Sequence, residues 1–180
     1  MGPENTTWRH AAICIPLCTV NSVPSILFTV RSAKLRRHGG EISFPGGSMD
    51  PGDIDVYATA LRETHEEIFI DPVHVTPLGV FHPMPDRTHT ILIHPVLCHV
   101  QMPVDPKAMR FSDSEVGEVF AVGLKELVGM ETKVERFRDG GREVRNWVVG
   151  EGKTIWGLTA WVLEEVLSII VAPGPKRPTA

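Results

Sequence analysis

Apolar residues along the chain fall into short runs rich in β-branched side chains, broken by turn-forming pairs such as Asn21-Ser22. Runs of this kind predict strands. They occur at residues 11–20, 23–31, 73–80, 90–100 and 115–122, the last being a short strand or a junction from helix to strand. The first two runs are predicted to pair as a hairpin, and a Pro- and His-rich loop is predicted at residues 82–89.

A different pattern occupies residues 53–68, where Ala and Glu are frequent and Asp55 is placed to cap a helix. The residues that share its core-facing side are Tyr57, Leu61, Thr64 and Ile68. The C-terminal third predicts a short helix at 124–128, a hairpin of strands 134–137 and 143–149 over Asp139-Gly140-Gly141, and an amphipathic helix at 159–171 capped by Thr159. Strands mixed with helices indicate an α/β or α+β sandwich.

Composition narrows the class of protein. A chain of 180 residues fits one domain, and a net charge of −4 argues against broad binding of nucleic acid. No apolar run reaches the roughly 18 residues of a membrane span, and the N-terminus lacks a secretion signal. Cys14, Cys18 and Cys98 form no C-x-x-C pair, which favours reduced thiols in a core over a zinc finger.

Three carboxylates gather on the predicted helix. Glu63, Glu66 and Glu67 are spaced i, i+3 and i+4, so they lie within about 100° of one face. Like charges at this spacing destabilise a helix by about 0.2–0.5 kcal/mol per pair, unless a cation binds there. Their hard oxygens favour Mg²⁺ or Mn²⁺ over zinc. On the helix alone, a solvated acidic face is an equal alternative.

The glycine pair Gly46-Gly47 shortly precedes this helix. Glycines allow the backbone to approach a phosphate, and a cation held by carboxylates would bridge the same phosphate. No Walker loop and no G-x-G-x-x-G fingerprint follows a predicted strand. The loop and the acidic face together therefore favour a site that cleaves a diphosphate.

The segment from Gly47 to Ile70 resembles the Nudix box, G-x5-E-x7-R-E-U-x-E-E-x-G-U, in which U is apolar. Arg62-Glu63 match its R-E pair and Glu66-Glu67 its E-E pair. The resemblance implies the Nudix fold, a mixed β-sheet sandwiched between α-helices. It also implies that the three glutamates bind the metal and that Arg62 braces the loop against the helix.

The chain departs from the box at three points. Asp53 stands in place of the first Glu, one extra residue lies between Asp53 and Arg62, and Phe69 replaces the late Gly. A glycine there can end the helix in the left-handed region at little cost, whereas Phe69 must end it otherwise or add strain of about 1–2 kcal/mol. This departure concerns the helix end more than metal binding.

A second pattern, LFTVRSAKLRRHGGEISFPGG at residues 27–47, resembles the coenzyme A diphosphatase branch of the family. Later blocks at residues 114–124 and 155–160 are similar to that branch too. The resemblance implies hydrolysis of coenzyme A or its thioesters to 3′,5′-ADP and (acyl-)4′-phosphopantetheine. It implies Mg²⁺ or Mn²⁺ as cofactor, a small-molecule substrate and a mitochondrial location. The N-terminus carries no clear targeting signal, which by itself favours a cytoplasmic location.

The same resemblance implies roles in the site for further residues. Gly46 and Gly47 would present backbone to the metal or phosphate. Glu115, preferred to Glu118, would complete the metal shell or act as base, and the alternative is an exposed acid. The cations of the basic stretch, which could bind the 3′-phosphate or simply be solvated, are Arg31, Lys34, Arg36 and Arg37.

Two other functions stay open: a Nudix hydrolase of other nucleoside diphosphate derivatives, and a module that binds a nucleotide or coenzyme A without cleaving it. The expected organisation is a flexible N-terminus at 1–9, a Nudix domain at 10–173 and a disordered Pro-rich tail at 174–180. The protein is expected to be a monomer or homodimer that is not secreted and binds neither nucleic acid nor membrane.

Overall fold

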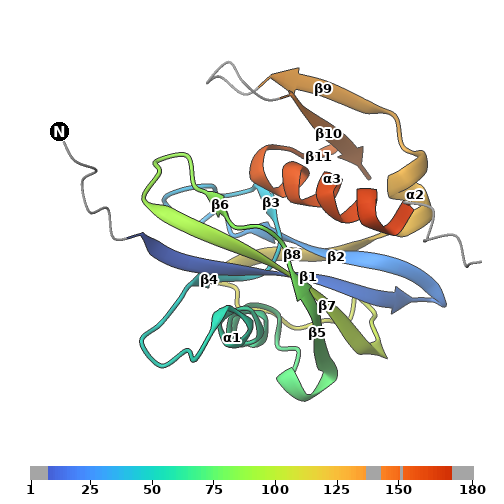
Figure 1. The fold of residues 1–180 in the computed structure, drawn as a ribbon. Coiled ribbons are helices and arrows are strands. Elements are labelled where there is room, and N and C mark those ends of the chain that lie inside the picture. Colours follow the sequence, from blue (N-terminus) through green and yellow to red (C-terminus); the bar gives the residue numbers. More distant parts are fainter. Residues whose placement is uncertain (1–7, 137–142, 151, 172–180) are drawn as a thin grey trace, which may run out of the picture. The chain divides into compact units, whose positions relative to one another are not determined.

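The computed structural model describes residues 8–136, 143–150 and 152–171. The chain forms two compact units that meet in sequence between Gly123 and Leu124, and each is described by itself. The elements of the first unit are β1 (Arg9–Val20), β2 (Val23–Arg31), β3 (Ile42–Ser43), β4 (Gly46–Ser48), α1 (Val56–Ile68), the 3₁₀ turn η1 (Pro72–His74), β5 (Val75–Val80), β6 (Met84–Pro85), β7 (Ile91–Pro103) and β8 (Val116–Gly123) (Figure 1).

The strands of the first unit form one mixed sheet. Its central order is β3-β2-β1-β7-β5, with β4 on β1, β6 on β7 and β8 on β2. Strands β1 and β7 run parallel, and the other pairings are antiparallel. The predicted hairpin of β1 and β2 is confirmed, with Val20 opposite Val23. The predicted mixed sheet and the α+β class are therefore confirmed.

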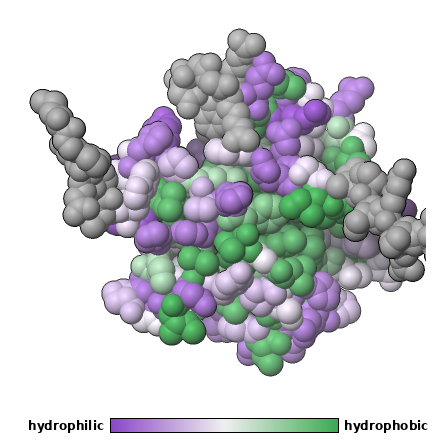
Figure 2. Space-filling view, viewed as in Figure 1, coloured by the Kyte–Doolittle hydropathy of each residue, from purple (hydrophilic) through white to green (hydrophobic). Residues whose placement is uncertain are grey.

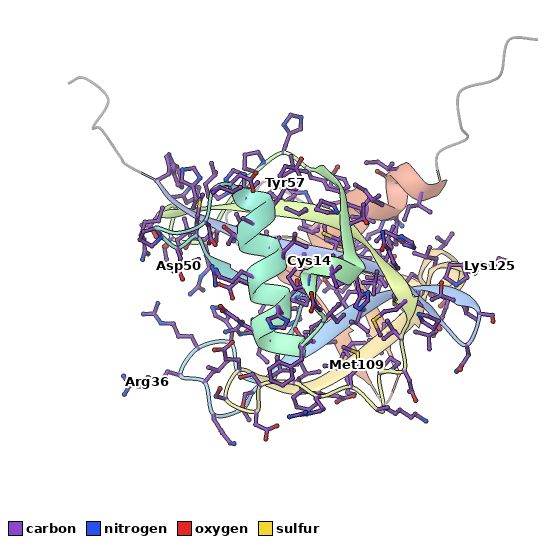
Figure 3. All side chains as sticks on the ribbon, turned by 90° about the horizontal axis from the view of Figure 1, so that it is seen from below. Cys14, Arg36, Asp50, Tyr57, Met109 and Lys125 are labelled. Carbon is purple, nitrogen blue, oxygen red and sulfur yellow. The ribbon has the colours of Figure 1, made fainter. Side chains whose placement is uncertain are left out.

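Helix α1 packs against β1 and closes a core over one face of this sheet. The Asp55 side chain accepts a hydrogen bond from the Ala58 N–H at 2.8 Å, which confirms the predicted cap. Alternate residues of β1, including Ala12 and Cys14, are fully buried in a cluster that also contains Ala60 of α1 (Figure 3). All three cysteines are free and buried, as predicted.

The second unit contains α2 (Leu124–Gly129), β9 (Thr132–Arg136), β10 (Glu143–Val149), β11 (Lys153–Ile155) and α3 (Gly157–Val171). Its strands are antiparallel in the order β11-β10-β9, so the predicted pairing of β9 with β10 is confirmed. The predicted turn at 139–141 lies outside the described residues. The Trp147 indole N–H donates to the Leu127 carbonyl at 3.2 Å, which ties β10 to α2.

Several local predictions were wrong. Thr159 does not cap α3, because the helix begins at Gly157 and the Trp156 carbonyl accepts from the Ala160 N–H. Arg9, expected to be flexible, begins β1. Strands β3, β4, β6 and β11 were not predicted, since two or three residues are too few to carry a period, and β6 lies in the expected 82–89 loop.

The predicted domain limits, 10–173 with a tail at 174–180, stay predictions, because most of those ends lie outside the described residues. No helix among the described residues is long and apolar enough to cross a membrane. On the face drawn in Figure 2, hydrophobic side chains reach the surface in patches among hydrophilic ones.

Candidate active site

The glycine pair lies on β4, directly beside β1. A Cβ on Gly46 would come 2.4 Å from the Ala12 carbonyl oxygen, so no other residue fits there without moving the backbone. A Cβ on Gly47 would come 2.5 Å from a carboxylate oxygen of Glu63. Gly46 is therefore needed for the close approach of β4 to β1, and Gly47 makes room for the Glu63 carboxylate.

The three helix carboxylates lie in different environments. The Glu67 residue is 5% exposed, whereas the side chain of Glu63 is 13% exposed and that of Glu66 is 52% exposed. The three carboxylates therefore do not form a fully solvated acidic face, because the Glu67 side chain is buried. The Gly46 N–H donates to that Glu67 carboxylate, which links the glycine pair to the helix.

Charge accumulates around Glu67. Burial raises the pKa of Glu67 to about 8, Arg31 opposes this rise, and the Glu63 and Glu115 carboxylates add to it. The pKa of Glu63 is also raised, first by burial and then, against the effect of Arg62, by Glu66 and Glu115. The structure thus brings Glu115 from the segment before β8 to the acidic helix face, as the sequence prediction required.

Arg62 joins the loop to the helix. Its guanidinium donates to both carboxylate oxygens of Asp53, at 3.0 and 2.9 Å, and to the Ser48 carbonyl at 3.0 Å. It also donates to Glu63 at 2.9 Å and to Glu66 at 3.0 Å. The bracing role predicted for Arg62 is confirmed, and Asp53, which replaces the first Glu of the box, serves as its main partner.

The basic residues predicted to bind substrate separate into two environments. Arg31, at the end of β2, is half-buried near Glu67, and its Nε has no hydrogen-bond partner among the described residues. Arg36 is exposed and projects away from α1 into solvent (Figure 3). The proximity of Arg31 to Glu67 could not be foreseen, because it depends on β2 ending beside the last turn of α1.

The donor set fits a hard divalent cation. Buried carboxylates that raise one another's pKa need a compensating charge, and oxygen ligands of this kind suit Mg²⁺ or Mn²⁺. As the described residues stand, no three acidic, His or Cys side chains converge as a complete ion site. Arg62 holds Glu63 and Glu66 instead, so those two carboxylates would have to exchange part of that pairing for the ion.

Phe69 takes over the geometry of the glycine that it replaces. It has φ 53° and ψ 28°, in the left-handed region, and its N–H donates to the His65 carbonyl at 3.0 Å. An L-residue pays about 1–2 kcal/mol for this conformation. The helix therefore ends as in the box, with strain in place of glycine.

A model of the NUDIX domain matches residues 8–148 of the chain. The chain belongs to the Nudix family. This Nudix chain is 40% identical to the human protein named mitochondrial coenzyme A diphosphatase NUDT8, over 93% of the chain and 72% of that protein. It is 34% identical to the Citrobacter koseri protein named uncharacterized Nudix hydrolase NudL, over 94% of the chain and 88% of that protein.

Solved structures agree at the level of the fold. The Nudix chain resembles a MutT/nudix family protein from Enterococcus faecalis with a TM-score of 0.60 at 17% identity, over 99% of the chain and 68% of that structure. It resembles the Nudix hydrolase RenU from M. smegmatis with a TM-score of 0.59 at 14% identity, over 93% of the chain and 89% of that structure. The predicted Nudix fold is confirmed.

Proposed function

We propose that this Nudix hydrolase cleaves the diphosphate bond of coenzyme A and its thioesters, giving 3′,5′-ADP and (acyl-)4′-phosphopantetheine. The observation that carries the proposal is the buried Glu67 carboxylate, held by the Gly46 N–H and surrounded by Glu63 and Glu115. The similarity to relatives named coenzyme A diphosphatases supports the choice of substrate.

Glu63, Glu66 and Glu67 would hold Mg²⁺ or Mn²⁺. When bound, such a cation neutralises charge on the non-bridging oxygens of the diphosphate and favours attack by water at phosphorus. Gly46 and Gly47 would present backbone to the metal or phosphate beside the helix, since neither carries a side chain. Arg62 would keep the carboxylates in place through Asp53 and the Ser48 carbonyl.

The remaining residues would bind the substrate and move a proton. The half-buried Arg31 guanidinium carries its positive charge beside the carboxylates, so it would attract a diphosphate oxygen. A carboxylate oxygen of Glu115 would accept the proton of the attacking water. Arg36, with Lys34 and Arg37 in the same exposed loop, would attract the 3′-phosphate.

The location proposed for this chain rests on its relatives. The human and mouse proteins are named mitochondrial, which supports a mitochondrial location for this chain. A monomer or homodimer that acts on a small molecule stays our expectation. Phe69 retains the turn that the box glycine provides, so the helix end gives no support to a non-catalytic binding module.

The test is incubation of the purified chain with coenzyme A and Mg²⁺ or Mn²⁺, with 3′,5′-ADP measured by chromatography. A chelator serves as the metal-free control, and nucleoside triphosphates and NADH serve as competing substrates. Metal-dependent release of 3′,5′-ADP, faster than cleavage of the other substrates, is expected. Binding of coenzyme A without release, or preferential cleavage of another diphosphate, would refute the proposal.

A further inference from the structure

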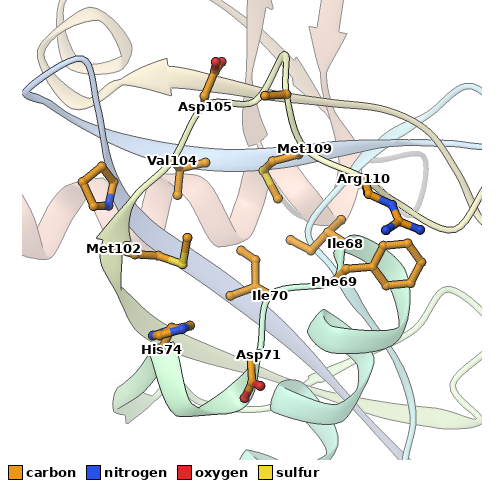
Figure 4. Close-up of a pocket in the computed structure, with 12 residues that line it drawn as sticks. Ile68, Phe69, Ile70, Asp71, His74, Met102, Val104, Asp105, Met109 and Arg110 are labelled. Atoms are coloured by element: carbon orange, nitrogen blue, oxygen red, sulfur yellow. The ribbon is translucent and has the colours of Figure 1, made fainter.

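Arg110, in the segment that follows β7, is an exposed cation beside an aromatic ring. Its guanidinium carbon lies 5.9 Å from the centre of the Phe69 ring, a distance at which the ring attracts a cation. Figure 4 shows the two side chains next to each other at one end of a groove, with Asp71 and Asp105 away from them. Among the described residues, no carboxylate forms an ion pair with Arg110. Its charge is therefore held in place without being neutralised in that part of the chain.

Phe69 keeps a strained backbone although its ring is not part of the core. Its φ of 53° lies in the left-handed region, which glycine adopts freely and an L-residue does not. The residue is 48% exposed, so burial does not account for the presence of the side chain. Strain persists where a function requires it. The contact with Arg110 is one that the glycine of the Nudix box could not make.

Hydrogen bonds join this pair to the candidate active site. The Ser112 N–H donates to the Glu67 carbonyl at 2.9 Å, two residues along each segment from the contact of Arg110 with Phe69. Residues 110–112 therefore run beside the last residues of α1. The Glu115 N–H then donates to the Ser112 carbonyl at 2.9 Å, in a turn that leads to the carboxylate near Glu67.

The same segment also contacts the start of the basic loop. The Ser32 N–H donates to the Glu115 carbonyl at 2.8 Å, and the Ser32 hydroxyl donates to the Asp113 carbonyl at 3.1 Å. The basic loop, which contains Arg36, begins directly after Ser32. Arg110 and the basic loop are therefore joined to the carboxylates by one short segment.

The cations around the carboxylates differ in how they are held. Arg62 is paired with carboxylates, and Arg31 is half-buried near Glu67. Arg36 is exposed and projects away from α1 into solvent (Figure 3). Arg110 combines exposure with a position fixed by a ring. A guanidinium held in this way loses less freedom on binding, and its in-plane N–H donors stay available to a phosphate.

Coenzyme A carries two anionic groups on one ribose: the diphosphate that is cleaved and a 3′-phosphate. We propose that Arg110, positioned by the Phe69 ring, binds this 3′-phosphate and so sets a preference for coenzyme A over substrates that lack it. The basic loop attracts the same phosphate from solvent, whereas Arg110 holds it. This proposal rests on the proposed function, because it assumes that the diphosphate lies beside Glu67.

The first experiment compares kcat/KM for coenzyme A and for 3′-dephospho-coenzyme A in the parent and in Arg110→Gln. Loss of a hydrogen bond between charged groups is expected to lower kcat/KM for coenzyme A about 10- to 100-fold. The loss is expected mainly as a higher KM, because the contact is remote from the reacting phosphorus. The value for the dephospho substrate should stay within about twofold, as for an exposed residue that makes no contact. Equal losses for the two substrates, or no loss for either, would overturn the proposal.

Lys107→Gln is the matched control for this experiment. Lys107 is an exposed cation of the same segment and does not line the groove. Its replacement removes the same charge and should leave the preference for coenzyme A unchanged. Arg110→Lys keeps the charge without the planar fork, so its preference should lie between those of the parent and Arg110→Gln. Equal losses in Lys107→Gln and Arg110→Gln would indicate a general effect of charge and would also overturn the proposal.

The second experiment tests Phe69 as a positioning residue. Phe69→Leu removes the ring and keeps an L-residue in the left-handed region, whereas Phe69→Tyr keeps the ring. The preference for coenzyme A over its dephospho form is expected to fall about two- to fivefold in Phe69→Leu and to persist in Phe69→Tyr. When Arg110→Gln is already present, Phe69→Leu should not change the preference further. An unchanged preference in Phe69→Leu alone would refute the role of Phe69.

Direct binding separates this proposal from the proposed function. Affinities for 3′,5′-ADP and 5′-AMP, which differ by the 3′-phosphate alone, are measured by calorimetry for the parent, Arg110→Gln and Lys107→Gln. The parent is expected to bind 3′,5′-ADP at least about tenfold more tightly, and of the two variants Arg110→Gln alone should lose this difference. If the parent does not cleave coenzyme A, the proposed function fails, and this binding pattern would still support Arg110 as a 3′-phosphate site. Equal affinities of the parent for the two nucleotides would refute it.

Discussion

The N-terminal and C-terminal ends of helix α1, its first and second ends, differ in how their charged and polar groups are paired. At the first end, every polar group that we have described has a partner of opposite character. Asp55 caps the Ala58 N–H, and the Asp53 carboxylate accepts from Arg62, from the Thr59 hydroxyl at 2.9 Å and from the Asp50 N–H at 2.9 Å. These bonds hold the pKa of Asp53 well below its usual range, with the Arg62 hydrogen bonds as the largest cause.

At the second end, like charges and strain accumulate. Glu67 is buried next to Glu63 and Glu115. The helix ends at Phe69, whose backbone lies in the left-handed region. Strain and unbalanced charge of this kind lower stability, and they persist where a function requires them. The comparison indicates that the first end of α1 stabilises the fold, and it supports our proposal that the second end carries the chemistry.

The largest effect is expected for Glu67→Gln, which tests whether the second end of α1 is catalytic. If the second end is catalytic, kcat for coenzyme A should fall by about 10²–10³-fold, as when one group that stabilises transition-state charge is removed. The melting temperature of the metal-free protein should stay the same or rise, because burial and neighbouring carboxylates oppose the Glu67 charge. Glu126→Gln, at an exposed residue of α2, is the control. Full activity in Glu67→Gln would mean that the acidic face is structural.

The first end is tested by Asp53→Asn, which should lower the free energy of unfolding by about 1–3 kcal/mol, because the side chain is 7% exposed and its bonds to Arg62 are charged. The pH dependence follows from the sign of the shift. Since the pKa of Asp53 is lower in the folded state, its contribution is present above the ordinary value of about 4 and is lost as the pH falls.

Urea titrations between neutral pH and pH 2.5 measure both effects. The parent chain should lose stability steeply in the acid range, and the Asp53→Asn variant should do so less steeply. Equal slopes for the two proteins would show that the Asp53–Arg62 pair adds nothing to acid sensitivity.

The smallest effect is expected for the strained helix end. Phe69→Gly and Phe69→Ala both remove the ring, but only glycine adopts the left-handed region freely. The glycine variant should therefore be more stable than the alanine variant by about 1 kcal/mol in the free energy of unfolding, measured by denaturation. Alanine as stable as glycine would mean that the strain is released by a change of the helix end.

Some of this protein could be predicted from neighbouring residues. The hairpin of β1 and β2 follows from two β-branched runs around Asn21-Ser22, and α1 follows from its Asp55 cap and its periodic face. The carboxylate spacing and the glycine pair likewise predict a diphosphate site from residues that lie close together in the sequence. Each of these features depends on residues that are close together in the sequence.

Other features depend on contacts between distant segments. No local pattern indicates that Arg31 ends β2 beside Glu67, or that Ser112 hydrogen-bonds the Glu67 carbonyl. The strands β3, β4 and β6 exist because longer strands offer them free backbone groups, and their own residues are too few to predict them.

The sequence by itself determined which side chains this Nudix chain brings to its site: the three helix glutamates, Arg62 and the glycine pair. Only the tertiary structure decided how much each side chain is buried, and hence that the pKa values of Glu63 and Glu67 are raised. It also left the Glu66 side chain 52% exposed. The physical reason is that spacing on a helix fixes direction, whereas the cost of a charge depends on everything packed around it.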